Sequence, residues 1–287
     1  MKIFDFIWDE IVHGGHWGSL SAPAVVLSSM YIIGDIRWEL LVIAYLAIQA
    51  IYTYNHYKEI EKDELSNAPR VKHLRRYIEY LPLITACYGI GFFSLLFYFA
   101  NRLALYFGSF LFLLGILFTH GGKHVTASIP VFKTVYASLC WGMIIIFVAI
   151  YCNYSLDLRI FLLFAFVFLR FTVDTIFFDI KDVEADKRHG LLTMPVIFEN
   201  KAKCLKFLHT VNFLSVLPIV VGVVFDIFPV FTISLTLTVI YAFIYLEKSK
   251  QKDADILSIS YILVDGEYVF WPFYLLVGKI FFDLLVR

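Results

Sequence analysis

Two groups of oxygen-bearing side chains stand out as residues that could do chemistry. In the first group, Asn55, Glu59 and Asp63 are spaced four residues apart. On a helix, each step of four residues turns the chain by only about 40°, so the three side chains share one face. Carboxylates placed this close repel one another unless a cation lies between them. The spacing therefore indicates a cation site on this helix.

The second group has the same character. Asp179, Asp182 and Asp186 are spaced three and four residues apart and also share one helix face. Oxygen ligands of this kind suit hard divalent cations, Mg²⁺ above all, which typically share them with substrate phosphates. Taken singly, either group could be a solvated helix end paired with neighbouring lysines. Those lysines are Lys58, Lys62, Lys181 and Lys187. Taken together, the two groups favour a site for a metal ion and a diphosphate.

Basic residues near both groups could hold that diphosphate. Lys123 and Lys133 belong to one segment between apolar stretches, Arg70 follows the first group, and Arg188 follows the second. A metal-bound diphosphate keeps exposed anionic oxygens, for which Arg or Lys is the natural partner. Membrane topology offers a simpler explanation for each basic residue alone, because cytoplasmic loops are rich in Lys and Arg.

The composition places this chemistry in a membrane. Of the 287 residues, 60% are apolar and 17% are charged, and the mean hydropathy is +0.77. Soluble domains carry about 25% charged residues. The formal net charge is zero, so we expect no nucleic-acid partner. The four cysteines show no metal-ligand spacing and are interpreted as apolar fillers.

Nine uncharged or nearly uncharged stretches are candidates for membrane-spanning helices, since a span needs about 20 largely apolar residues. We expect helices because backbone polar groups in lipid must be paired internally. The stretches are Trp17–Gly34, Leu40–Tyr57, Tyr80–Asn101, Leu103–Gly122, Thr134–Leu156, Ile160–Leu169 with its continuation past Arg170, Phe207–Phe225, Ile227–Leu246 and Tyr268–Gly278. The predicted fold is a single all-α membrane domain over residues 1–287. Within it, Met1–Glu10 is expected to form an interfacial helix before the first span.

The basic residues also predict the orientation. Most of the 24 Lys and Arg residues fall in the N-terminal segment and in four long connections. These connections are Lys58–Glu79, Lys123–Lys133, Asp174–Lys206 and Glu247–Glu267. The positive-inside rule then places the N-terminus and the long connections in the cytoplasm. Both acidic groups lie on that side.

Two segments make the chain resemble the UbiA superfamily of intramembrane prenyltransferases. Residues 55–63 read NHYKEIEKD, followed by NAPR at 67–70, where the family typically has Asn-Asp-x-x-Asp-x-x-x-Asp and then Asn-x-Pro-x-Arg. Residues 179–195 read DIKDVEADKRHGLLTMP, close to the family's second aspartate-rich motif and its trailing Gly-x-x-Thr-Leu-Pro. Glu59, His56 and Ala185 depart from the usual pattern, in which Asp, Asp and Gly stand at these positions.

The resemblance implies nine transmembrane helices around a central cavity and a magnesium-dependent prenyl transfer. An isoprenyl diphosphate is ionised, and the prenyl group passes to an acceptor, most readily an aromatic or quinone-precursor molecule. The implied metal ligands are the six residues of the two groups, with Asp63, Asp182 and Asp186 as the catalytic ones. The implied diphosphate-binding residues are Arg70, Lys133, Lys123, Arg188 and Asn67. Acceptor contacts are expected near the start of the first span, at His16, Trp17 and Ser21.

Two other functions remain open from the sequence. A terpene cyclase could use the same diphosphate site without an external acceptor. A transporter could bind ions at the acidic residues, although transporters generally place such charges near the middle of the bilayer. Here the acidic groups follow the ends of the apolar stretches, which favours the enzyme.

Overall fold

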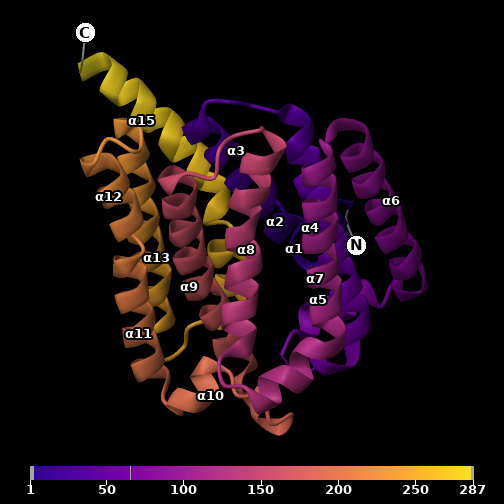
Figure 1. Ribbon diagram of the computed structural model, residues 1–287. Helices are drawn as coiled ribbons and strands as arrows, with labels where there is room; N and C mark the ends of the chain where they lie inside the picture. Colours follow the sequence, from indigo (N-terminus) through magenta and orange to yellow (C-terminus); the bar gives the residue numbers. More distant parts are fainter. Residues whose placement is uncertain (1–2, 65, 286–287) are drawn as a thin grey trace.

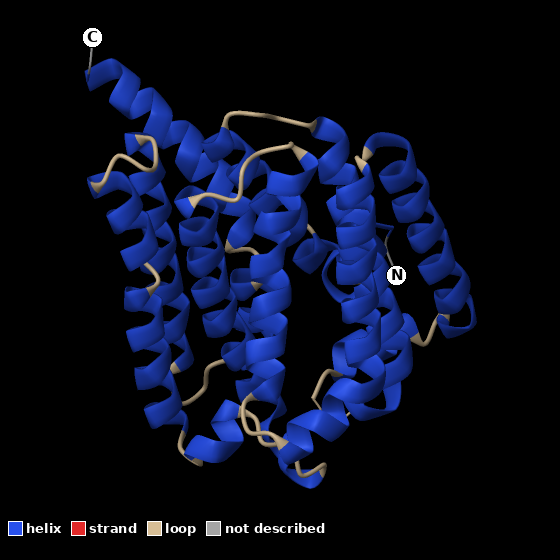
Figure 2. Cartoon of the chain, viewed as in Figure 1, coloured by secondary structure: helices blue, strands red, loops and turns tan. Residues whose placement is uncertain are grey.

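The computed structural model describes residues 3–64 and 66–285, except for the side chains of Lys62 and Lys123. Every regular element in this part of the chain is a helix (Figure 2). The first half contains α1 (Ile3–His13), α2 (His16–Ser19), α3 (Ser21–Ile33), α4 (Trp38–Asp63), α5 (Ala68–Leu74), η1 (Ile78–Tyr80), α6 (Leu81–Phe99) and α7 (Arg102–Ser128).

The second half continues the same pattern of long helices joined by short ones. It contains α8 (Phe132–Tyr151), α9 (Leu158–Arg188), α10 (Met194–Phe198), α11 (Lys201–Leu214), α12 (Leu217–Val224), η2 (Val230–Thr236), α13 (Leu237–Ser249), α14 (Ile256–Ser258), η3 (Ile259–Val264), η4 (Tyr268–Phe270) and α15 (Trp271–Leu285). The long helices run side by side as a bundle, and α10 lies at its lower end in Figure 1.

Seven helical segments of the described chain are long and apolar enough to cross a membrane. They are Ile78–Phe99, Arg102–Gly122, Phe132–Tyr151, Leu158–Arg188, Lys201–Val224, Val230–Ser249 and Ile256–Leu285. The first two predicted spans are helical as well, in α2–α3 and α4. However, α3 has only 13 residues, and α4 is polar toward its C-terminal end. The predicted all-α membrane fold is confirmed.

The segment predicted as an interfacial helix is helical in α1, and its position at the membrane surface stays a prediction. Its apolar side chains Ile3, Phe4, Ile7 and Trp8 are exposed. An amphipathic helix with exposed bulky apolar groups is suited to lie at the boundary between lipid headgroups and acyl chains.

Small residues let the helices that surround the centre approach closely. A β-carbon at Gly115 of α7 would lie 2.5 Å from Cδ1 of Ile51 on α4, too close for any other residue type without rearrangement. Helix interfaces in membranes favour such residues because packing, rather than the hydrophobic effect, holds the helices together.

A fully buried ion pair joins α9 to the segment just before η4. The side chains of Arg170 and Glu267 are both 0% exposed. Arg170 Nε donates to Glu267 Oε1 at 2.9 Å, and Nη2 donates to Oε2 at 2.6 Å. Asn212 and Ser215 on or next to α11 accept further hydrogen bonds from the guanidinium. This pairing explains how α9 carries an arginine through the apolar bundle.

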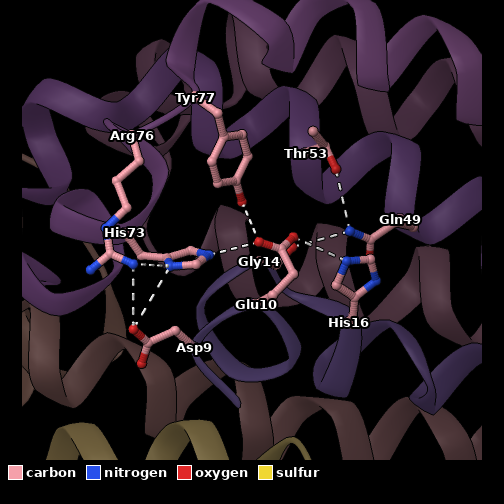
Figure 3. A network of polar contacts seen from close by, with 9 residues as sticks. All are labelled: Asp9, Glu10, Gly14, His16, Gln49, Thr53, His73, Arg76 and Tyr77. Carbon is pink, nitrogen blue, oxygen red and sulfur yellow. Dashed lines mark hydrogen bonds and ion pairs between the residues drawn. The ribbon is translucent and has the colours of Figure 1, made fainter. Parts of the chain in front are cut away.

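A second polar network ties α1 to α5 (Figure 3). The carboxylate of Glu10 accepts hydrogen bonds from His73 Nε2 and from Tyr77 Oη, both at 2.7 Å, and lies 3.3 Å from His16 Nε2. Asp9 lies 3.7 Å from Arg76. Burial raises the pKa of the Glu10 carboxyl, but its three hydrogen-bond partners outweigh burial and hold the pKa well below its usual range. The network holds the C-terminal end of α5 and the residues after it against α1.

The buried pair predicts an asymmetric response to mutation. Arg170→Met alone leaves Glu267 charged and buried, and we expect it to lower the free energy of unfolding by about 3–5 kcal/mol. Arg170→Met combined with Glu267→Leu removes both charges and should recover most of that loss. Denaturant unfolding in detergent micelles, followed by tryptophan fluorescence, measures both variants. Equal stability of the single and double variants would contradict this account.

The Glu10 network predicts a pH-dependent contribution to stability. A carboxyl with a lowered pKa stabilises the fold above the unfolded pKa of about 4.3, and the contribution is lost as the pH falls below it. At pH 6, Glu10→Gln should lower the free energy of unfolding by about 1–3 kcal/mol. The gap between wild type and variant should narrow as the pH is lowered to 3. Asp253→Asn, at an exposed carboxylate, is the control that should show no gap.

Candidate active site

A polar cavity of about 320 Å³ lies inside the bundle, between α4, α8, α9 and the C-terminal helices. Its wall combines charged and aromatic groups. The charged and amide residues on the wall are Asn55, Glu59, Asp63, Asn67, Arg70, Lys133, Asp174, Lys181, Asp182 and Asp265. The cavity thus gathers residues from positions 15 to 268 of the chain.

All three residues of the first group line this cavity. The helix α4 continues to Asp63, so Asn55, Glu59 and Asp63 share a helix face as their spacing predicts. Thr119 of α7 donates a hydrogen bond to Asn55 Oδ1 at 3.3 Å. Burial raises the pKa of Asp63, and Glu59 adds to the rise against the opposing effect of Arg70 and Lys181. A cation bound beside Asp63 would add to the effect of Arg70 and Lys181 and favour the ionised carboxylate.

The second group is divided between the cavity and the protein interior. Asp182 lines the cavity, where Lys181 Nζ donates to its two oxygens at 2.9 and 2.8 Å. Asp179 is 0% exposed and forms an ion pair with Lys133. Asp186 is also 0% exposed and accepts a hydrogen bond from Thr193 Oγ1 at 3.1 Å. Neither Asp179 nor Asp186 belongs to the cavity wall.

The expected diphosphate-binding residues are also divided. Lys133, Arg70 and Asn67 line the cavity. The guanidinium of Arg70 lies 4.6 Å from the centre of the Tyr261 ring, and Tyr261 Oη donates to Asn67 Oδ1. Arg188 is exposed and lies outside the cavity wall. The side chain of Lys123 lies outside the described part of the structure.

The Glu10 network described above supports the part of the cavity wall that carries Arg70. Arg70 belongs to α5, between Asn67 at its N-terminal end and His73, which Glu10 holds. His13 of α1 also packs edge-on against Tyr261, with ring centres 5.6 Å apart. The helix α1 therefore supports the segment that presents Arg70 to the cavity.

Several wall residues were missed by sequence reasoning. Lys181 stands inside the second motif and was interpreted only as a neutralising neighbour. Asp174 and Asp265 are single acidic residues without a partner at helical spacing, so no pattern marked them. The charge pattern predicts both in long connections, but the structure places Asp174 inside α9 and Asp265 inside the candidate span Ile256–Leu285. The apolar residues beside each of them were the available signal, because intramembrane carboxylates are costly.

Three aromatic residues form a stacked column in the cavity wall. The ring centres of Trp141 and Phe171 are 4.0 Å apart with an interplanar angle of 9°, and those of Phe171 and Tyr268 are 4.1 Å apart at 12°. All three residues line the cavity. Such faces attract cations and planar aromatic groups. Of the expected acceptor contacts, Ser21 lines the cavity, whereas His16 and Trp17 are not part of its wall.

An apolar cavity of about 200 Å³ lies next to the polar one, between α4, α6, α7 and α8. Ile51, Tyr52, Gly115 and Trp141 belong to the walls of both. The remaining lining is almost wholly aliphatic and aromatic, including Ala44, Ala47, Phe92, Leu111 and Phe147. A molecule with a charged head and a hydrocarbon tail fits this pair of spaces.

The donor set of the polar cavity fits a hard divalent cation. Within the described residues, no three His, Cys, Asp or Glu side chains lie close enough to hold a metal ion by themselves. The available donors are carboxylate and amide oxygens of Asn55, Glu59, Asp63 and Asp182. Mg²⁺ usually keeps several waters and is bound by one or two carboxylates together with substrate phosphates. Separated oxygen donors are therefore compatible with Mg²⁺ that arrives with a diphosphate.

Solved structures of similar fold span almost the whole chain. The apo structure of a UbiA homologue from Aeropyrum pernix K1 matches with a TM-score of 0.70 and 14% identity, covering 92% of this chain and 96% of that chain. A UbiA homologue from Archaeoglobus fulgidus bound to GPP and Mg²⁺ matches with a TM-score of 0.64 and 14% identity, covering 94% and 98%. The same comparison finds that homologue bound to DMAPP and Mg²⁺, with a TM-score of 0.61, 14% identity and coverage of 93% and 98%.

The family is established by sequence. No curated protein matches the chain. The model of the UbiA prenyltransferase family matches residues 19–264, which include both aspartate-rich segments and most of the cavity wall. The chain is thus a multi-pass integral membrane protein that belongs to the UbiA prenyltransferase family.

Proposed function

We propose that this protein is a magnesium-dependent intramembrane prenyltransferase that transfers the prenyl group of an isoprenyl diphosphate to an aromatic or quinone-precursor acceptor. One observation carries the proposal. Carboxylates and cations from both aspartate-rich segments line a single polar cavity, and an apolar cavity inside the bundle shares part of its wall with the polar one. The headgroup and tail of an isoprenyl diphosphate need these two environments in direct contact.

The polar cavity holds the diphosphate in this proposal. Arg70, Lys133 and Lys181 place positive charge around it, and Asn67 offers an amide. Asn55, Glu59, Asp63 and Asp182 would hold Mg²⁺, which acts as a Lewis acid on the leaving diphosphate. Asp179 fixes Lys133 through their buried ion pair, and Asp186 fixes the turn at Thr193. For Lys123 and Arg188, contact with the diphosphate rests on the family resemblance alone.

The apolar cavity holds the prenyl tail and keeps water away from the reacting carbon. Loss of the diphosphate leaves an allylic cation, which water would trap. Trp141, Phe171 and Tyr268 line the polar cavity, and an aromatic face that meets a dry cation stabilises it by on the order of 1–2 kcal/mol. The acceptor then attacks the same carbon.

The orientation follows from the distribution of positive charge. The connections rich in Lys and Arg lie at the end of the bundle that carries α10 in Figure 1. We place this end, the N-terminus and the mouth of the polar cavity in the cytoplasm. A water-soluble short-chain diphosphate would then enter from the side on which it is made.

The carboxylates of the cavity give the first test. Asp63→Asn and Asp182→Asn remove negative charge and should each lower magnesium-dependent prenyl transfer by at least about 100-fold, because charge placed at the reacting centre contributes that much. Membrane insertion should not change. Transfer is measured with purified protein, Mg²⁺ and radiolabelled prenyl diphosphates.

Matched controls come from the same two segments. Glu61 and Glu184 are exposed carboxylates on the same helices, so Glu61→Gln and Glu184→Gln should keep wild-type transfer. Full activity of either cavity variant would contradict the proposed site. A cyclised hydrocarbon formed without any acceptor would favour the terpene cyclase instead.

The apolar cavity gives a test of chain length. Ala44 on α4 lines the apolar cavity, and Ala44→Phe would fill part of its volume. The ratio of kcat/KM for long over short prenyl diphosphates should fall about tenfold, since one filled hydrocarbon site changes discrimination by about 1–3 kcal/mol. Val42→Phe, at an exposed position on the same helix, is the control. An unchanged ratio in Ala44→Phe would place the tail elsewhere.

A further inference from the structure

The short helix α5 presents Arg70 to the polar cavity but has little stability of its own. It has seven residues, and helices shorter than about 12 residues are marginal in isolation. The side chain of its N-cap residue, Asn67, makes no capping hydrogen bond to the described residues of α5. Instead, Asn67 Oδ1 accepts a hydrogen bond from Tyr261 Oη. The position of Arg70 therefore depends on contacts that α5 makes with other parts of the chain.

Two kinds of contact hold α5. Val71 and Leu74 belong to a buried apolar cluster that includes residues of α4 and α6. His73 is 1% exposed, and its Nε2 lies 2.7 Å from Glu10 Oε2 of α1. Apolar contacts have no preferred direction, whereas a hydrogen bond to a carboxylate constrains both distance and angle. The contact with Glu10 is therefore the one suited to set how α5 is turned about its axis.

Three residues of α1 converge on His73. Phe6, Glu10 and His13 are spaced four and three residues apart, which places them on one side of the helix. The ring centres of Phe6 and His13 lie 5.7 and 6.4 Å from that of His73, and Glu10 supplies the hydrogen bond (Figure 3). His73 follows Arg70 by three residues, which is about one turn of the helix. The contact surface of α1 thus lies one turn from Arg70.

A second route joins α1 to Arg70 through an aromatic ring. The guanidinium of Arg70 lies 4.6 Å from the centre of the Tyr261 ring, and His13 packs edge-on against the same ring. Arg70 Nε is buried and has no hydrogen-bond partner among the described residues. A buried donor without a partner is costly. The surrounding contacts therefore keep one donor of Arg70 available to an anionic ligand.

We propose that Glu10 is a positioning residue for the diphosphate: by holding His73 and Tyr77, it orients α5 so that Arg70 meets the diphosphate head in the cavity. This inference rests on the proposed function and adds to it a residue that lies outside the cavity wall. Glu10 acts through α5 alone. Its loss weakens binding of the diphosphate head and leaves the space for the prenyl tail unchanged.

The sign of the effect separates positioning from simple electrostatics. Glu10 is a carboxylate, and a negative charge near an anionic ligand repels it. If only the field of Glu10 reached the diphosphate, removal of its charge would tighten binding. If Glu10 positions Arg70, removal of its charge releases His73 and weakens binding.

The test measures binding of prenyl diphosphates with ten and with twenty carbons to the full chain in lipid nanodiscs with Mg²⁺. Glu10→Gln should raise both dissociation constants about tenfold, the size expected when a hydrogen bond to a charged group is lost. The factor should be the same for both ligands, because Arg70 meets the head that they share. Glu10→Asp keeps a carboxylate on a shorter arm and should recover part of the affinity. A loss that differs between the two ligands would place the effect at the tail and refute the positioning role.

A matched control comes from another pair of glutamate and histidine. His209 Nε2 of α11 lies 3.0 Å from Glu247 Oε1 of α13. Glu247→Gln breaks this contact without touching α1 or α5, and it should bind both diphosphates as wild type does. An equal loss of affinity in Glu247→Gln would mean that any broken contact of this kind weakens binding, and the special role of Glu10 would fall.

A double-mutant cycle tests whether Glu10 acts through Arg70. Arg70→Gln should weaken binding of the prenyl diphosphate. In that background, Glu10→Gln should change the dissociation constant by less than about twofold, because the residue that it positions is already gone. Independent effects, in which the two factors multiply, would contradict the inference.

The number of binding sites separates positioning from partial unfolding. Irreversibly unfolded protein lowers the number of sites per chain and leaves the dissociation constant of the remaining sites unchanged. Calorimetric titration measures both quantities, and Glu10→Gln should keep the wild-type number of sites while its dissociation constant rises. Fewer sites at an unchanged dissociation constant would assign Glu10 a purely structural role.

Failure of this inference and failure of the proposed function give different results. Glu10→Gln that binds prenyl diphosphates as tightly as wild type, or more tightly, overturns the positioning role and leaves the proposed function standing. Wild-type protein that binds no prenyl diphosphate in the presence of Mg²⁺ overturns both.

Discussion

Charge inside an apolar bundle is stable only where it is paired or faces an enclosed polar space, and this constraint organises the structure. Arg170 and Glu267 are fully buried and neutralise each other, and Lys133 does the same for Asp179. Five other carboxylates line one cavity, namely Glu59 and Asp63 of α4, Asp174 and Asp182 of α9, and Asp265 beside η3. The cost of isolated charge thereby separates groups that hold helices together from groups that are left available to a ligand.

The helix α9 connects these two roles along its length. From its middle toward its C-terminal end it carries Arg170, then Asp174, and then the second aspartate-rich segment, all on one unbroken helix that ends at Arg188. A rigid element of this kind fixes the spacing between the deep and the shallow parts of the cavity. The packing of α8 against α9 and the support of α5 by the Glu10 network complete the wall from the other sides (Figure 3).

The first aspartate-rich segment could be placed from sequence because its chemistry is local. The spacing of Asn55, Glu59 and Asp63 puts them on one helix face whatever surrounds them, and all three line the cavity. The second segment has equally regular spacing, yet only Asp182 of its three aspartates lies on the wall. A side chain on a helix can line a cavity or pair with a lysine. The outcome depends on residues far away in the chain, such as Lys133, and helical spacing in the sequence does not reveal these partners.

The sequence by itself determined that this chain is an all-helical membrane protein with two acidic segments and the family to which it belongs, since hydropathy, helical spacing and motif order are properties of short stretches. Only the tertiary structure decided which carboxylates form ion pairs, that Trp141, Phe171 and Tyr268 stack, and that Asp265 lines the cavity. These facts depend on contacts between residues 30 to 97 positions apart in the chain, and the energies of such contacts are set by packing geometry rather than by local sequence.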